Sequence, residues 1–203
     1  MQNIKNIIFD LGGVILNIDI RRTEKALREL GIDNLSQHMN QAHLLSFFKE
    51  YEEGKIDDAA FIRAIRSLSQ RALEEDAIVN AWNALLLDFP AERIELLRRL
   101  RKKYRLFLLS NTNGIHYRKF QQQLFVQTGH YLEDLFEKTY YSHTIGLSKP
   151  DAAAFRLVIE ENKLDPAETI FIDDTEANMS GAKETGLHVA LLRPDTSIMD
   201  FEW

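Results

Sequence analysis

Cysteine is missing from this chain of 203 residues, so disulfides and thiolate metal ligands are excluded. An excess of basic residues is missing too: the net charge of −6 argues against a general nucleic-acid binder, because phosphate backbones demand a basic face. Apolar runs such as Ala84–Leu87 fall far short of a membrane span, and the N-terminus shows no signal-peptide core. We therefore expect a cytoplasmic protein without a membrane or nucleic-acid partner; the oligomeric state is left open.

Strands and helices alternate over most of the chain. Ile4–Leu11 has the short, apolar, β-branched pattern of a buried strand, and alternation resumes from Pro90 onward. This order predicts an α/β protein with a doubly wound, Rossmann-like parallel sheet. A block without strands interrupts it. We interpret residues 17–88 as an inserted α-helical cap domain, and residues 1–16 together with 89–203 as the core domain.

Capping residues mark where several helices begin. In the cap, the spacing predicts a helix over Arg21–Leu30, a second after Ser36, a third after Asp57 and a fourth from about Glu74. In the core, Pro90 is predicted at the first position of one helix, and Pro150 at the start of another.

Polar residues follow the strands at the points where ligands bind to open parallel sheets. They are Asp10, Ser110-Asn111-Thr112, Lys149 and Asp173-Asp174. Because the carboxyl ends of parallel strands share one edge, we expect these residues to form one cluster. The sequence supports a nucleophilic carboxylate at Asp10 and a hydroxyl and backbone N–H for an oxyanion at Ser110 and Asn111. The adjacent carboxylates at 173 and 174 crowd negative charge in a way that Mg²⁺ would relieve.

Each piece taken alone has an ordinary structural explanation. Asp10 can be a turn residue, the segment at Ser110 an N-cap, and Lys149 a solvated surface lysine. One member of the pair Asp173-Asp174 can cap the following helix while the other is solvated.

The order and placement of the four pieces resemble the motifs of the haloacid dehalogenase (HAD) superfamily. Motif I of that family is an Asp after the first strand, here in "FDLGGV", and motif II is a Ser or Thr after the second, here Ser110 in "LLSNT". Motif III is a Lys, here Lys149 in "SKPD", and motif IV is an acidic pair, here in "FIDDTEAN". The match runs from Phe9 to about Gly186, and the helical insert resembles the family's C1-type cap. The tail "DDTEANMSGAKETG" looks like the subgroup of sugar-phosphate phosphatases and the phosphatase domain of soluble epoxide hydrolases.

The resemblance implies a magnesium site. Mg²⁺ would be held by the Asp10 carboxylate, the backbone carbonyl of Gly12 and Asp174. Asp173 would lie just outside the ligands and orient a metal-bound water, and Asn178 would support the same site.

The resemblance also implies the reaction of a phosphatase. Asp10 would attack the phosphorus of a small phosphomonoester, with a sugar phosphate favoured, and form an aspartyl-phosphate. Ser110 and the N–H of Asn111 would hold a phosphoryl oxygen, and Lys149 would balance the charge of the nucleophile and phosphate. Positioning and charge neutralisation provide most of the catalysis in phosphoryl transfer.

Gly12 departs from the family pattern, where most phosphatases have a second Asp that handles the proton. One explanation is a slower or rewired phosphatase, because "DLGGVILNID" resembles motif I of bacterial α-glucose-1-phosphate phosphatases. The proton would then come from water or from a residue such as Asp19. Asp19 can equally be the N-cap of the following helix. A second is a 2-haloacid dehalogenase, although the retained pair Asp173-Asp174 counts against it. A third is a catalytically weak protein that binds a phosphorylated ligand or a partner.

Substrate choice is expected from the cap, which would close over the site and expel water. The turn "YEEGKID" is of the kind that can reach the core. Cap residues that could face a polar substrate, although most are expected to be solvated or structural, are His38, His43, Glu52, Glu53, Lys55 and Trp82.

Overall fold

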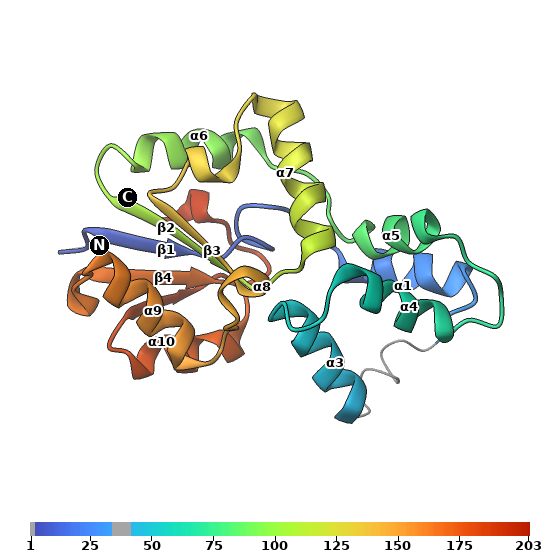
Figure 1. The fold of residues 1–203 in the computed structure, drawn as a ribbon. Coiled ribbons are helices and arrows are strands. Elements are labelled where there is room, and N and C mark those ends of the chain that lie inside the picture. The colour runs from blue at the N-terminus through green and yellow to red at the C-terminus, as the bar shows by residue number, and fades with distance from the viewer. Residues whose placement is uncertain (1–2, 34–41) are drawn as a thin grey trace.

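The centre of the molecule is a parallel sheet (Figure 1). The computed structural model describes residues 3–33 and 42–203 of the chain. Five strands pair in the order β3-β2-β1-β4-β5, every pair parallel, as the alternating sequence predicts. The strands are β1 (Asn6–Phe9), β2 (Arg105–Ser110), β3 (Lys138–Tyr141), β4 (Thr169–Asp173) and β5 (His188–Leu191).

Helices cover both faces of this sheet. Figure 1 shows α6 (Ala91–Leu100) and α7 (Gly114–Thr128) on one face, and α9 (Ala152–Asn162) and α10 (Met179–Glu184) on the other. The doubly wound α/β prediction is therefore confirmed. Shorter helical turns are α8 (Ser142–Ile145), η1 (Leu132–Asp134), η2 (Pro166–Glu168), η3 (Glu176–Asn178) and η4 (Ile198–Asp200).

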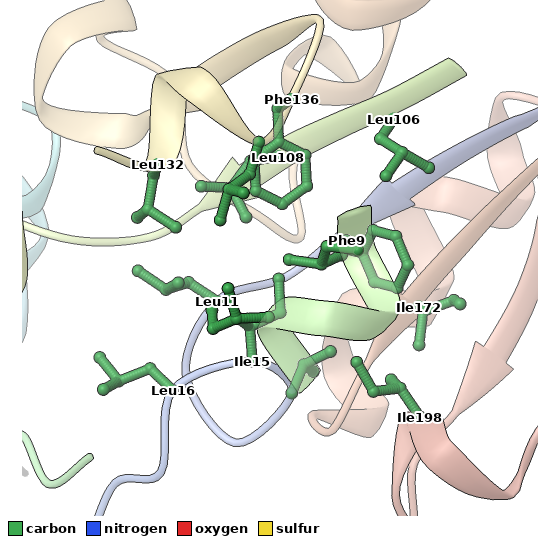
Figure 2. Close-up of a cluster of buried hydrophobic side chains, with 14 of the residues drawn as sticks. Phe9, Leu11, Ile15, Leu16, Leu106, Leu108, Leu132, Phe136, Ile172 and Ile198 are labelled. Atoms are coloured by element: carbon green, nitrogen blue, oxygen red, sulfur yellow. The ribbon is translucent and has the colours of Figure 1, made fainter. Parts of the chain in front are cut away.

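Side chains of successive strand residues alternate between two apolar cores, as the pleat of a strand requires. Ile7 and Phe9 of β1 enter the core beneath α6 and α7, whereas Ile8 enters the core beneath α9 and α10. Figure 2 shows the first of these cores, where side chains from β1, β2 and β4 meet others from the segment after β1. Leu11 and Ile15 of that segment are almost fully buried, so packing holds the loop that follows Asp10.

The inserted helices form a unit with a core of its own. They are α1 (Ile20–Glu29), α3 (Ala42–Glu52), α4 (Asp58–Ser67) and α5 (Glu75–Asn83), and they lie beyond the carboxyl ends of the strands (Figure 1). Their shared core is aromatic: the rings of Tyr51 and Phe61 stack with centroids 4.1 Å apart, and Trp82 packs against Phe61 at 4.7 Å. This is the predicted helical cap.

Two crossing segments connect the cap to the core, and backbone hydrogen bonds join them. The N–H of Asn17 donates to the Asp88 carbonyl over 2.9 Å, and the N–H of Leu87 donates to the Asn17 carbonyl over 3.0 Å. We propose that the domain boundaries lie at this paired segment, with residues 17–88 as the cap and 1–16 with 89–203 as the core.

Two predicted helix starts are wrong by one or two residues. Pro90 lies just before α6, which begins at Ala91, because the extended backbone of Pro90 has not yet turned into the helix. Pro150 precedes α9, which begins at Ala152 after Asp151 accepts a hydrogen bond from the Ala153 N–H. The predicted cap of α4 is confirmed, since Asp57 accepts from the Ala60 N–H over 2.7 Å.

Three further expectations concern the cap and the membrane. The predicted helix start at Ser36 and the candidate His38 lie outside the described residues. Across residues 3–33 and 42–203, none of the helices combines the length and apolar character that crossing a bilayer would need.

Candidate active site

The predicted cluster lies where the strand order reverses, between β1 and β4. Asp10 follows the last residue of β1, and Asp173 is the last residue of β4. β1 and β4 are neighbours at the centre of the sheet; β2 and β3 lie on the side of β1, and β5 lies on the side of β4. A doubly wound sheet opens a crevice for ligands at this switch point.

Lys149 joins the two acidic strand ends. Its ammonium donates to Asp10 Oδ1 and to Asp173 Oδ2, both over 2.6 Å. The Lys149 side chain is 1% exposed and that of Asp173 is fully buried. A buried lysine with two carboxylate partners is no solvated surface residue, so the ordinary explanation for Lys149 does not hold.

Asn111 fixes the position of Lys149. The Asn111 amide nitrogen donates to the Lys149 carbonyl and its oxygen accepts from the Lys149 N–H, each over 2.9 Å. The Asn111 side chain is therefore committed to the lysine loop, which leaves its backbone N–H as the group for an anion. Ser110 precedes Asn111 at the end of β2 and is buried, with 3% of its surface exposed.

Burial and the neighbouring charges act in opposite directions on the pKa values of Asp10 and Lys149. It raises the pKa of Asp10 to about 7; the Lys149 ammonium opposes this shift and the Asp173 carboxylate adds to it. Burial alone would lower the pKa of Lys149, but the two carboxylates outweigh it and raise the pKa above its usual range. The attraction of the lysine therefore favours a carboxylate at Asp10.

The two adjacent aspartates have different surroundings. Asp173 is fully engaged: besides Lys149 it accepts from the Thr175 N–H over 2.7 Å and from the Asn178 amide over 2.9 Å. Asp174 is exposed, and burial of part of its surface together with the Asp173 charge raises its pKa. Asp174 accepts from the Thr175 hydroxyl over 3.3 Å and is the more accessible member of the pair for a ligand.

Carboxylate oxygens of Asp10, Asp173 and Asp174 lie within 4.8 Å of one another. Lys149 contributes one positive charge against three carboxyl groups, so a divalent cation with oxygen ligands fits this cluster. The loop after β1 approaches it closely. A Cβ on Gly13 would lie 1.9 Å from Asp174 Oδ2, and the φ of +72° at Gly13 suits glycine.

Gly12 leaves no side chain where the family's second Asp would stand. A Cβ added there would lie 3.1 Å from Cδ1 of Ile18, whose side chain occupies the neighbouring space. Asp19 does not join the cluster: it is the N-cap of α1 and accepts from the N–H and guanidinium of Arg21. Hydrogen bonds from Arg21 lower the pKa of Asp19, which disfavours the protonated form that a proton donor needs.

Two parts of the site escaped the sequence reasoning. The close approach of Gly13 to Asp174 was not foreseen, although two consecutive glycines after a strand are a signal for such an approach. Ser148 was not singled out either; its hydroxyl donates to Glu53 of the cap over 2.7 Å, and both side chains are buried. No local pattern links residues that are so far apart in the chain.

The fold and the cluster define a hydrolase of known type. The sequence pattern of the haloacid dehalogenase-like hydrolases matches residues 4–186. The chain belongs to this family.

Relatives within the family are similar over nearly the whole chain. A D-ribitol-5-phosphate phosphatase from Bacteroides thetaiotaomicron is 33% identical over 183 residues, which cover 90% of this chain and 89% of that enzyme. The crystal structure of a HAD family enzyme from the same organism, in complex with magnesium and inorganic phosphate, superposes with a TM-score of 0.87. It is 35% identical and the match covers 96% of this chain and 97% of that one.

The dehalogenase alternative has weaker support. The L-2-haloacid dehalogenase of Xanthobacter autotrophicus is 22% identical, with a TM-score of 0.61 over 93% of this chain and 77% of that one. This likeness shows a shared fold and nothing more.

Proposed function

We propose that this protein is a magnesium-dependent phosphatase that hydrolyses a small phosphomonoester through an aspartyl-phosphate on Asp10. One observation carries the proposal: Lys149 bridges Asp10 and Asp173 at the switch point of the sheet, with Asp174 beside them. A sugar or polyol phosphate is the favoured substrate, in keeping with the phosphatase relative that acts on D-ribitol 5-phosphate. A small phosphorylated metabolite also favours a cytoplasmic location.

The residues present fit a bound Mg²⁺. We propose Asp10, Asp174 and the backbone carbonyl of Gly12 as its ligands; Asp173 and Asn178 hold the arrangement from outside, because Asp173 is already hydrogen-bonded at both oxygens. When bound, the ion supplies positive charge that neutralises the carboxylates and the phosphoryl oxygens.

Asp10 is the nucleophile of the proposed reaction. Its carboxylate attacks phosphorus, the ester P–O bond breaks, and the leaving oxygen departs with the bonding electrons. Ser110 and the Asn111 N–H hold a phosphoryl oxygen, while Lys149 offsets the charge on Asp10. Water then attacks the phosphorus of the aspartyl-phosphate, which releases inorganic phosphate and restores Asp10.

Water supplies the proton for the leaving oxygen in this proposal. Gly12 has no side chain to donate one, and Asp19 is held as a carboxylate by Arg21. General acid–base help is typically worth about 10² to 10⁴ in rate, so we expect slower turnover than in a phosphatase with Asp at this position.

Phosphate release from a panel of monoesters tests the proposal. We expect release that needs Mg²⁺, stops with a chelator, and falls by at least about 10³-fold in Asp10→Asn. The variant Asp76→Asn, at an exposed position in the first turn of α5, is the matched control. Halide release from 2-chloropropionate without metal would instead identify a dehalogenase, and Mg²⁺-dependent ligand binding without turnover would identify a binding protein.

A further inference from the structure

A cavity of about 600 Å³ lies between the cap and the catalytic lysine; we call it the cap pocket. One wall is a face of α3 and the other is the loop that carries Lys149, so the pocket borders the proposed phosphoryl site. Its volume is in the range of small-molecule sites. The lining residues are Phe48, Lys49, Glu52, Ser148, Lys149, Pro150 and Asp151.

The turn after α3 is fixed against the core, so the pocket has a defined shape. Glu53 accepts from the Ser148 hydroxyl over 2.7 Å. The backbone of Gly54 packs against the His143 carbonyl: an added Cβ would lie 2.1 Å from the carbonyl oxygen, and the φ of +67° also favours glycine at this position. Arg118 of α7 donates to Asp58 over 2.5 Å, which holds the start of α4 in the same way.

Glu52 differs from its neighbours in lacking a partner. Lys49 pairs with Glu53 at 3.6 Å, and Glu53 is further engaged by Lys55 at 2.7 Å. Within the part of the chain that the structure describes, Glu52 has neither a hydrogen bond nor an ion pair, although it is half-buried on the pocket wall. Burial and the Glu53 charge raise the pKa of Glu52, and Lys149 opposes this shift. A carboxyl group that is partly withdrawn from water and has no donor among the described residues can accept a hydrogen bond from a ligand hydroxyl.

The charges of the pocket favour a neutral leaving group. Lys149 is hydrogen-bonded to Asp10 and Asp173, and Lys49 lies 3.6 Å from Glu53. Glu52 and Asp151 add two acidic groups to the wall, and their charges would repel a second anionic group on the substrate.

We propose that Glu52 selects the substrate by accepting hydrogen bonds from the hydroxyl groups of a neutral, polyhydroxylated leaving group in the cap pocket. The inference rests on the proposed phosphatase function. Glu53 has a different task in this arrangement, because it anchors the turn that presents Glu52.

Steady-state kinetics with three esters test this inference. Ribitol 5-phosphate offers hydroxyl groups, p-nitrophenyl phosphate offers none on its leaving group, and 3-phosphoglycerate carries a carboxylate. We expect Glu52→Gln and Glu52→Ala to lower kcat/KM for ribitol 5-phosphate by about 10- to 100-fold, the value of a hydrogen bond to a charged group. The variants should change kcat/KM for p-nitrophenyl phosphate by less than about threefold, and raise it for 3-phosphoglycerate.

Glu50→Gln is the control, since it removes the same charge from α3 at a residue that does not line the pocket. We expect it to leave all three values unchanged. An equal loss on all three esters in the Glu52 variants would mean a structural role, and no change would mean no role; either result overturns the inference. A wild-type protein inactive on every ester would overturn the proposed function itself.

Discussion

Gly13 and Asp174 come from loops 161 residues apart, yet the backbone of one lies against the carboxylate of the other. The contact depends on the missing Cβ, because that atom would lie 1.9 Å from Asp174 Oδ2. Gly13 therefore supports a proposed magnesium ligand by leaving room for it, without contributing a functional group.

The substitution Gly13→Ala, compared with a control glycine of similar φ, distinguishes the steric clash with Asp174 from the strain of a positive φ. We expect it to displace Asp174 and lower Mg²⁺-dependent phosphate release by at least about tenfold, as disturbed support of a metal ligand typically does. Gly129→Ala is the matched control: its φ of +73° brings the same strain, about 1–2 kcal/mol, but a Cβ there meets no atom within 4 Å among the described residues. Equal activity in the two variants would contradict the role of Gly13, with stability checked by urea unfolding.

Single residues were predictable where their chemistry follows a strand. Asp10, Ser110, Lys149 and the pair at 173 and 174 were expected together because parallel strands end at one edge. The structure brings Asp10, Lys149, Asp173 and Asp174 together there, and it places Ser110 at the end of the neighbouring strand β2. The burial of Asp173 and the exposure of Asp174 could not be predicted, since both depend on which way each side chain turns at the end of β4.

At the scale of elements, the beginning of α7 connects the core to the cap. Asn113 caps α7 by accepting from the His116 N–H, so its amide nitrogen must be the atom that donates to His116 Nδ1. His116 Nε2 therefore carries the proton and donates to the Trp82 carbonyl over 3.0 Å. The imidazole also stacks on the Trp82 ring with centroids 5.2 Å apart. A second proton would bind at His116 Nδ1, where it would face the hydrogens of the Asn113 amide and remove the hydrogen bond between these two groups.

This arrangement predicts a loss of stability in acid. Burial lowers the pKa of His116 from 6.5 to about 4, although the hydrogen bond to Trp82 opposes the shift. Below pH 6.5 His116 binds a proton in the unfolded chain, whereas in the folded chain it binds one only near pH 4. The contribution of His116 to the free energy of unfolding is therefore complete above pH 6.5 and declines as the pH falls. The expected loss is about 3 kcal/mol.

Urea unfolding of the wild type and of His116→Gln, at several pH values, measures this loss. The glutamine variant cannot titrate, so the difference in unfolding free energy between the two proteins should shrink by about 3 kcal/mol from neutral pH to pH 4. A difference independent of pH would contradict the account of His116.

Elements were predictable where local chemistry decides them. The first strand was expected from the short apolar run Ile4–Leu11, and the caps of α1 and α4 from Asp19 and Asp57. The starts of α6 and α9 were misplaced because proline is compatible with the residue before a helix as well as with its first turn. The link from His116 to Trp82 joins two helices, and each sequence pattern alone describes only its own helix.

At the scale of the whole molecule, the cap and the core each supply a part of the proposed site. The core gathers the lysine and carboxylates at the edge of the sheet, and the cap adds the wall of the cap pocket that carries Glu52. A helical cap was predictable from the strand-free block that interrupts the alternation of strands and helices. The contacts that join the two parts, such as Glu53 with Ser148, depend on how the cap sits on the core, which no sequence spacing encodes.

The central claim is that Asp10 carries the phosphoryl group during turnover. Acid quenching during steady-state hydrolysis, followed by peptide mass spectrometry, tests it most directly. We expect acid to trap the aspartyl-phosphate, visible as one phosphoryl group on the peptide that contains Asp10 and absent from Asp10→Asn. Rapid hydrolysis with an unmodified Asp10 peptide, together with full activity of Asp10→Asn, would contradict the account.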